Sequence, residues 1–256
     1  MKDNFPLVKL IQWILGRKDR LLGGLFISDR PFSGISLRTI VYIDGFNLYF
    51  GSLQGSPHRW LDISKLAHRI SKEQNIHSKI VAVKYFTADI QAKLSERGQD
   101  SCISQRDYLL ALQAHISDIE IIKGKYFISK AHYYPHGEPV DFSKKHTVWR
   151  AEEKQTDVNI AVHMLCDVID NKCEQLIIFS NDSDLCPALS AIKERHPEIV
   201  IGTVAPLRGE KRNASADLKK HSDWTRNGIR IEELESSLLP DKVVTRKRVI
   251  KKPGHW

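Results

Sequence analysis

The chain has 256 residues, of which 41% are hydrophobic and 27% are charged, a composition that excludes wholesale disorder. Its net charge of +8 favours an anionic partner, with nucleic acid preferred over a membrane surface. No apolar run approaches the roughly 20 residues of a membrane-spanning helix, and the cysteines form no C-x-x-C pair, which indicates reduced thiols in a cytoplasmic protein rather than a zinc site.

Residues 1–37 form a predicted N-terminal extension. Five apolar residues recur there at helical spacing: Leu7, Leu10, Ile11, Ile14 and Leu15. Lys9 interrupts this stripe and no small-residue cleavage site follows it, which argues against a signal peptide. We expect a short amphipathic helix that packs on the main domain or frays. A membrane-surface or partner-binding helix is the alternative, and a misassigned start codon would also account for the extension.

From residue 38 to 239 we expect the main domain. Apolar runs of strand length alternate there with segments of helical periodicity, with strands at residues 40–43, 80–87 and 119–122 and helices at 61–71 and 96–117. This order predicts a parallel sheet with right-handed crossovers. The first strand runs directly into Asp44-Gly45-Phe46-Asn47, so an acid and an amide stand at its carboxyl end.

Residues 123–151 interrupt the alternation and are rich in Lys, His and aromatic residues. Pro and Gly near the middle of this insertion predict a β-ribbon or an excursion over the carboxyl edge of the sheet. Its histidines match no familiar metal-ligand spacing and are expected in solvent: His132, His136 and His146. Basic residues interleaved with aromatic ones suit a nucleic-acid path.

A helix is predicted from Glu152 onward, with Glu153 and Lys154 at its start and Asp157 in its first turns. One face of this helix is apolar and is expected to point into the core: Val158, Ala161, Val162, Leu165 and Ile169. A buried strand follows at residues 176–179, then a helix beginning near Asp184 and a strand at 199–204.

The last part of the chain is less regular. A basic loop contains Arg208, Lys211 and Arg212, and Ser215 is expected to cap a short helix. Ile229 and Ile231 indicate a last short strand. Residues 240–256 are rich in Lys and Arg and are predicted to form a disordered basic tail.

Acidic residues follow two of the predicted strands. Asp44 ends the first, and Asp182 and Asp184 come directly after the fourth, in Ser180-Asn181-Asp182-Ser183-Asp184. If the strand order reverses between these strands, their ends flank the switch point, where Asp157 joins them. Close carboxylates repel one another unless a cation or proton lies between them, and Mg²⁺ and Mn²⁺ prefer oxygen ligands. The pattern predicts a metal site, although each acid alone also fits a turn or a helix cap.

Three motifs, in this order along the chain, resemble the NYN domain, in particular its LabA-like branch within the PIN-like nuclease superfamily. They are YIDGFN at residues 42–47, EKQTDV at 153–158 and FSNDSD at 179–184. The weaker ending SADL at 215–218, with Asp223 beyond it, also fits. The resemblance implies a Rossmann-like, three-layer α/β sandwich with a mainly parallel sheet of five or six strands. It also implies a metal-dependent ribonuclease.

The resemblance assigns Mg²⁺ or Mn²⁺ binding and catalysis to four acids: Asp44, Asp157, Asp182 and Asp184. Asn47 would be a polar neighbour of the metal or substrate and is counted with the catalytic residues. Lys154 would face a phosphate. The other basic side chains expected to contact substrate phosphates are Arg150, Arg208, Lys211 and Arg212.

The expected activity is therefore a cytoplasmic endoribonuclease that uses Mg²⁺ or Mn²⁺. Two alternatives stay open: a non-catalytic RNA-binding or adaptor module on the same fold, and a metal phosphohydrolase of small nucleotides. The positive charge favours a polymer over a small nucleotide. The RNA target and the oligomeric state are left open, with a homo-oligomer as one option.

Overall fold

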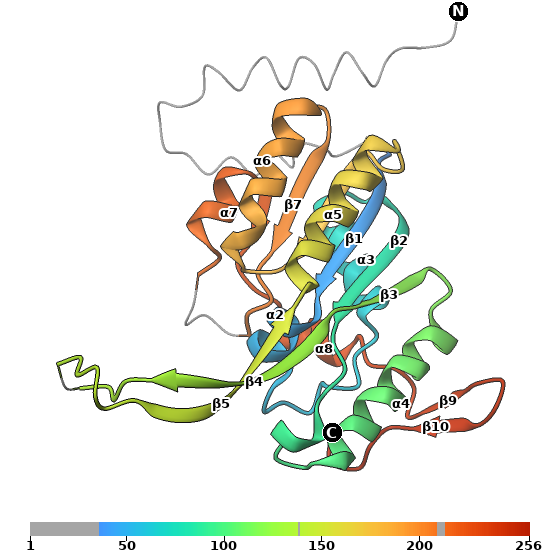
Figure 1. Cartoon of the computed structure of the whole chain (residues 1–256). Helices are drawn as coiled ribbons and strands as arrows, with labels where there is room; N and C mark the ends of the chain where they lie inside the picture. Colours follow the sequence, from blue (N-terminus) through green and yellow to red (C-terminus); the bar gives the residue numbers. More distant parts are fainter. Residues whose placement is uncertain (1–35, 138, 209–212) are drawn as a thin grey trace, which may run out of the picture.

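The centre of the protein is a six-stranded parallel sheet, seen in a computed structural model that describes residues 36–137, 139–208 and 213–256 (Figure 1). Its strands are β1 (Arg38–Asp44), β2 (Lys79–Thr87), β3 (Ile119–Lys123), β6 (Gln175–Phe179), β7 (Val200–Val204) and β8 (Trp224–Arg226). They lie in the order β3-β2-β1-β6-β7-β8, so the direction of growth reverses between β1 and β6. This confirms the predicted Rossmann-like α/β fold with a parallel sheet. The helix predicted near the N-terminus lies outside the described residues.

Helices cover both faces of the sheet and make two hydrophobic cores. Side chains alternate along β1, so Val41 and Ile43 enter one core while Ile40 and Tyr42 enter the other. The first core packs against α3 (Ile63–Gln74), α4 (Gln99–His115) and α8 (Ile231–Glu235). The second packs against α5 (Thr156–Ile169), α6 (Cys186–Arg195) and α7 (Ala216–Lys220). Burial on both faces explains why the strands are continuous apolar runs.

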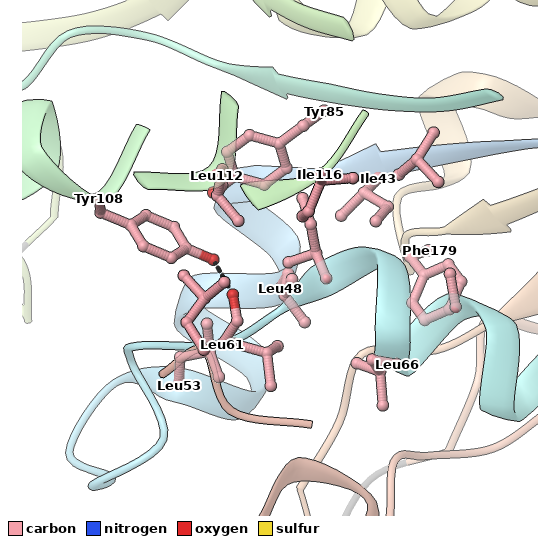
Figure 2. Packing of buried hydrophobic residues seen from close by; sticks show 14 of the residues in the cluster. Ile43, Leu48, Leu53, Leu61, Leu66, Tyr85, Tyr108, Leu112, Ile116 and Phe179 are labelled. Atoms are coloured by element: carbon pink, nitrogen blue, oxygen red, sulfur yellow. Dashed lines mark hydrogen bonds between the residues drawn. The ribbon is translucent and has the colours of Figure 1, made fainter. Parts of the chain in front are cut away.

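Figure 2 shows part of the first core, beneath the carboxyl end of β1. Ile43 and Phe179 enter it from the two central strands, and Leu48 from the short helix α2 (Gly45–Leu48) that follows β1. The hydroxyl of Tyr108 donates to the carbonyl oxygen of Leu61 at 2.8 Å, so this buried polar group has a partner. The turn after β1 is therefore held in place by packing against this core.

The insertion forms a two-stranded antiparallel ribbon of β4 (Lys125–Tyr133) and β5 (His146–Lys154), one of the two predicted forms. In Figure 1 the ribbon extends away from the sheet and its helices. Glu152, Glu153 and Lys154 belong to β5 and not to the helix predicted there. The helix starts only after Gln155, whose positive φ of 82° turns the chain from the ribbon into α5.

The predicted inner face of α5 is correct for Ala161 and Leu165, which are half-buried against the second core, and wrong for the other three residues. Val158, Val162 and Ile169 are 65%, 50% and 68% exposed. The fully buried residues of α5 in this core are Ile160, Met164 and Val168, which the prediction missed. Both sides of this helix are apolar, so periodicity alone did not distinguish the side that packs from the side that faces solvent.

The C-terminal segment is ordered, which corrects the predicted disordered tail. Strands β9 (Lys242–Val244) and β10 (Val249–Lys251) pair as an antiparallel hairpin that buries Val243 and Ile250. The Trp256 ring lies 6.1 Å from that of Trp60 between centroids. Each strand has a single buried residue between two exposed ones, and the exposed neighbours include Val244 and Val249, so the sequence shows no clear apolar–polar alternation that would have predicted the hairpin.

Several short elements complete the fold. They are the π-helix η1 (Tyr49–Leu53) and the 3-10 helices η2 (Ala92–Leu94) and η3 (Ser183–Leu185). Ser215 caps α7 as predicted, by accepting from the N–H of Leu218. The last parallel strand is β8 rather than a strand at Ile229 and Ile231, since Ile229 makes only an isolated bridge and Ile231 begins α8.

Within the described ranges, every helix is too short or too polar to cross a bilayer.

Candidate active site at the carboxyl edge of the sheet

Asp44 is the most buried acid of the candidate site, with 2% of its surface exposed. Its Oδ1 accepts from the backbone N–H groups of Phe46 at 3.1 Å and Asn47 at 2.9 Å, which caps α2. Its Oδ2 accepts from Asn47 Nδ2 at 2.6 Å and from the Ser180 hydroxyl at 3.0 Å. Four donors therefore fix the orientation of this carboxylate. Burial raises the pKa of Asp44 above its ordinary value against these hydrogen bonds, and the charge of Asp182 adds to the increase.

Gly45 allows the close packing of this turn. A Cβ atom at Gly45 would lie 2.5 Å from the carbonyl oxygen of Phe86 and 2.9 Å from the ring of Tyr85. The glycine of the DGFN motif is therefore explained by the close approach of β2, and its backbone does not have a positive φ.

Asp182 and Asp184 lie in the turn after β6, adjacent to β1 in the sheet. Asp182 Oδ1 accepts from the N–H of Asp184 at 3.0 Å, so it caps η3, as the alternative interpretation proposed. The N–H of Asp182 donates to the Ser180 hydroxyl oxygen at 3.1 Å. Asp182 is half-buried and Asp184 is exposed. The capping bond uses Oδ1 of Asp182, so Oδ2 of Asp182 and the carboxylate of Asp184 can accept a further ligand.

Asp157 comes to the same edge from the first turn of α5. Burial raises the pKa of its carboxyl to about 6, with further contributions from the charges of Asp44, Asp182, Glu153 and Asp184. The four predicted acids therefore lie close enough to interact. Sequence reasoning missed Glu153 as the fifth acid, because it placed this residue in a helix. Its position inside the EKQTDV motif was the available signal.

Two asparagines join the loops around the acids. Asn47 Oδ1 accepts from the N–H of Asn181 at 3.3 Å, and Asn181 Oδ1 accepts from the N–H of Ser215 at 2.6 Å. The turn after β1, the turn after β6 and the start of α7 are thus held together. Asn47 lies beside Asp44, to which its Nδ2 also donates at 2.6 Å.

The basic residues predicted to bind substrate are more scattered than the acids. Lys154 is exposed at the base of the ribbon, where its Nζ lies 5.5 Å from the centroid of the Phe127 ring. Arg150 lies farther along β5 and pairs with Glu152. Arg208 is exposed beyond β7. Lys211 and Arg212 lie outside the described residues.

The donor set suits a hard divalent cation. Among the described residues, no three His, Cys, Asp or Glu side chains stand close enough together to form a ready-made cage. However, the acids offer carboxylate oxygens, which Mg²⁺ and Mn²⁺ prefer. The mutual repulsion that contributes to the raised pKa of Asp157 is the kind that a bound cation relieves. Asp44, Asp157, Asp182 and Asp184 therefore fit such an ion by their chemistry.

Comparison with known proteins adds to this picture. The chain is 37% identical over 248 residues to 6-hydroxy-3-succinoylpyridine 3-monooxygenase HspA of Pseudomonas putida (strain DSM 28022 / S16), a match that covers 89% of this chain and 78% of the relative. Among solved structures it is similar to a protein of unknown function from Vibrio parahaemolyticus RIMD 2210633, with a TM-score of 0.43, 14% identity, and coverage of 84% of this chain and 100% of that chain. The family model of the NYN domain matches residues 38–225. This chain belongs to the NYN domain family.

Proposed function

We propose that this protein is a ribonuclease that hydrolyses phosphodiester bonds with Mg²⁺ or Mn²⁺ at the carboxyl edge of β1 and β6. The observation that carries the proposal is the convergence of Asp44, Asp157 and Asp182, from three distant parts of the sequence, at the topological switch point. Membership of the NYN family supports it, because that family belongs to the PIN-like nuclease superfamily.

The chain's own residues would hold and orient the reactants. Asp44, Asp157, Asp182 and Asp184 would hold the cation, with the Asp44 carboxylate fixed in advance by its four hydrogen-bond donors. When bound, such a cation supplies an activated nucleophilic water and offsets the charge of the leaving oxygen. Lys154 would contact a phosphate beside the acids. Hydrolysis of this kind would leave a 5′-phosphate and a 3′-hydroxyl.

The two alternatives on the same fold are less well supported. A non-catalytic adaptor has no use for a group of acids that raise one another's pKa, because that repulsion costs stability. A phosphohydrolase of small nucleotides would not need the net charge of +8. Polymer binding should weaken steeply with salt, whereas binding of a small nucleotide should change little.

Oxygenation of a substituted pyridine is a second candidate, favoured by the name of the relative at 37% identity. A monooxygenase reaction transfers one atom of O₂ to the substrate and reduces the other to water, with two electrons from a reductant. A ring at this edge would meet Phe46 and Tyr126, whose ring centroids are 5.9 Å apart. However, the turn after β1 is Asp-Gly-Phe-Asn, and the chain contains no G-x-G-x-x-G segment of the kind that binds nicotinamide dinucleotides. This favours the hydrolytic candidate.

The test compares the wild type with Asp182→Asn on RNA and DNA in Mn²⁺ or EDTA. We expect Mn²⁺-dependent cleavage of RNA by the wild type, none by Asp182→Asn, and RNA binding in EDTA by both proteins. The matched control is Asp170→Asn, an exposed aspartate at the opposite end of α5, which should cut at the wild-type rate. An Asp182→Asn protein that cuts RNA at the wild-type rate contradicts the proposal.

A parallel assay tests the second candidate. The wild type is supplied with 6-hydroxy-3-succinoylpyridine, O₂ and NADH or NADPH, and oxygen consumption is measured with product formation. Turnover without any cleavage of RNA would support oxygenation and reject the ribonuclease.

A further inference from the structure

The β4–β5 ribbon exposes large aromatic side chains that nothing within the described residues covers. Trp149 is 67% exposed, Phe127 56% and Tyr133 47%. The strands pair over nine positions, from Lys125 with Lys154 to Tyr133 with His146, which corresponds to a length of about 30 Å. An isolated two-stranded ribbon is only marginally stable in water. Exposed aromatic rings on such a ribbon therefore indicate a ligand-binding role rather than a structural one.

The ribbon starts and ends beside the four acids of the candidate site, Asp44, Asp157, Asp182 and Asp184, which we call the acid cluster. Residue Gly124 connects it to the end of β3, and Gln155 connects it to α5, whose first turn contains Asp157. At its base, the Tyr126 ring meets the edge of the Phe46 ring, 5.9 Å away between centroids. Phe46 itself donates its N–H to Asp44. Figure 1 shows the ribbon leaving the body from the turn region around α2. A chain bound along it would therefore lead to the acids.

The strand register places Trp149 on the same face of the ribbon as Tyr126, whose ring contacts Phe46. Directly paired residues share a face, and residues two apart along a strand do so as well. Tyr126, Lys130 and its partner Trp149 therefore share one face, with Trp149 about 13 Å along the ribbon from Tyr126. The opposite face carries Phe127 beside Lys154, together with Arg150. Each face thus combines an exposed aromatic ring with a cation.

The charge of the ribbon complements a polyanion. Between residues 125 and 154, the span of the ribbon, the sequence has six Lys or Arg and four Asp or Glu, a net charge of 6 − 4 = +2. Single-stranded nucleic acid offers both features that this surface matches, namely phosphates for the cations and open base faces for the rings. A duplex hides its base faces in the stack, so it would use the cations alone.

We propose that the β4–β5 ribbon is a binding arm for single-stranded RNA, with unpaired bases stacked on Trp149 and phosphates held by Lys130 on the same face. The identity of the nucleic acid as RNA rests on the proposed ribonuclease function. The arm lets the protein select unpaired over duplex RNA before the strand reaches the acids.

The test measures binding in EDTA, where cleavage does not interfere. A fluorescently labelled single strand and a hairpin duplex of the same composition are titrated with wild type, Trp149→Ala and Trp149→Phe. We expect Trp149→Ala to bind the single strand about ten-fold more weakly, with less than a two-fold change for the duplex. Trp149→Phe should keep most of the affinity, because a ring is retained. The control is Ile76→Ala, which removes an equally exposed apolar side chain before the start of β2, away from the ribbon.

Three outcomes would overturn the arm. They are unchanged single-strand affinity in Trp149→Ala, an equal loss for single strand and duplex, or binding by the wild type to anionic vesicles and not to RNA. The last would assign the ribbon to a membrane surface. The ribonuclease proposal is tested separately. If Asp182→Asn cuts RNA at the wild-type rate in Mn²⁺, the acid site is rejected. The binding measured in EDTA still decides whether the ribbon is a binding arm.

Discussion

The Ser180 hydroxyl donates a hydrogen bond of 3.0 Å to Oδ2 of Asp44 and thereby joins the ends of the two central strands at the acid cluster. The same oxygen accepts from the N–H of Asp182 at 3.1 Å, so one buried hydroxyl positions two of the acids. A hydroxyl can donate once and accept as well, which is why serine, rather than alanine or valine, is required at this point.

Replacing Ser180 with alanine removes the hydroxyl and with it both hydrogen bonds. Asp44 would stay buried with one donor fewer, so its pKa should rise further and cleavage should fall about ten-fold at neutral pH. The loss of unfolding free energy should be about 1 kcal/mol. Rates measured against pH should show the acidic limb moving to higher pH. Ser183→Ala, an exposed serine in the same turn, serves as the control, and equal behaviour of the two variants would contradict the role of Ser180.

The raised pKa of Asp157, at about 6, predicts a pH dependence of stability in the metal-free protein. A carboxyl whose pKa is higher in the folded than in the unfolded state stabilises the fold below its unfolded pKa. That stability is lost as pH rises through about 6. In EDTA, Asp157→Asn should therefore be more stable than the wild type at pH 7.5 but not at pH 4. Because the carboxyl remains partly exposed, solvent screening limits the gain to about 1 kcal/mol.

Urea unfolding at the two pH values measures this difference directly. Added Mn²⁺ should reverse it, because the cation stabilises the wild type through a carboxylate that the asparagine variant lacks. If Asp157→Asn gains no stability at pH 7.5 in EDTA, then repulsion between Asp157 and the neighbouring acids does not destabilise the wild type.

Much of the site was predictable because its motifs stand on strong secondary-structure signals. Asp44 and Asp182 each follow a continuous apolar run, and a parallel sheet brings such strand ends to one edge. The contribution of Ser180 was not predictable, since it depends on the register of Ile43 opposite Phe179. Glu153 was missed because a ribbon strand, and not a helix, carries it to the cluster.

The ordered C-terminal hairpin and the outer face of α5 show a second limit of sequence reasoning. In the hairpin, Lys and Arg together make up half of residues 242–251, while the buried residues are Val243 and Ile250. In α5, apolar residues occur on both sides, so the helical period alone was not decisive. Each case depended on long-range contacts that local patterns do not encode.

The buried Lys84 and Asp167 predict a large effect on stability. Lys84 Nζ lies 2.6 Å from Oδ2 of Asp167, and both side chains are almost fully buried. The Tyr42 hydroxyl donates to the same oxygen at 2.8 Å. Burial alone would raise the pKa of Asp167, but hydrogen bonds from Lys84 and Tyr42 and the charge of Lys84 lower it. Removing the lysine would leave this carboxylate without its closest positive charge.

We therefore expect Lys84→Met to lower the free energy of unfolding by about 3–5 kcal/mol. Lys84→Met combined with Asp167→Leu should be less damaging than Lys84→Met alone, because the single variant leaves the buried Asp167 carboxylate with the exposed Lys172, 3.2 Å from its Oδ1, as its remaining ion-pair partner. Chemical unfolding above neutral pH measures both. Lys65→Met, on the exposed face of α3, should change stability by less than about 0.5 kcal/mol. A double variant that is less stable than Lys84→Met would show that the carboxylate is satisfied without the lysine.

The orientation of α5 can be tested with a pair of truncations on its two sides. Ile160 is fully buried, so Ile160→Ala should cost about 2–5 kcal/mol. Val162 is 50% exposed, so Val162→Ala should cost less than about 0.5 kcal/mol in the same urea titration. The reverse order would mean that the helix is rotated about its axis. Asp157 lies three residues before Ile160, on the same side of α5, so that rotation would also take it away from Asp44 and the acid cluster.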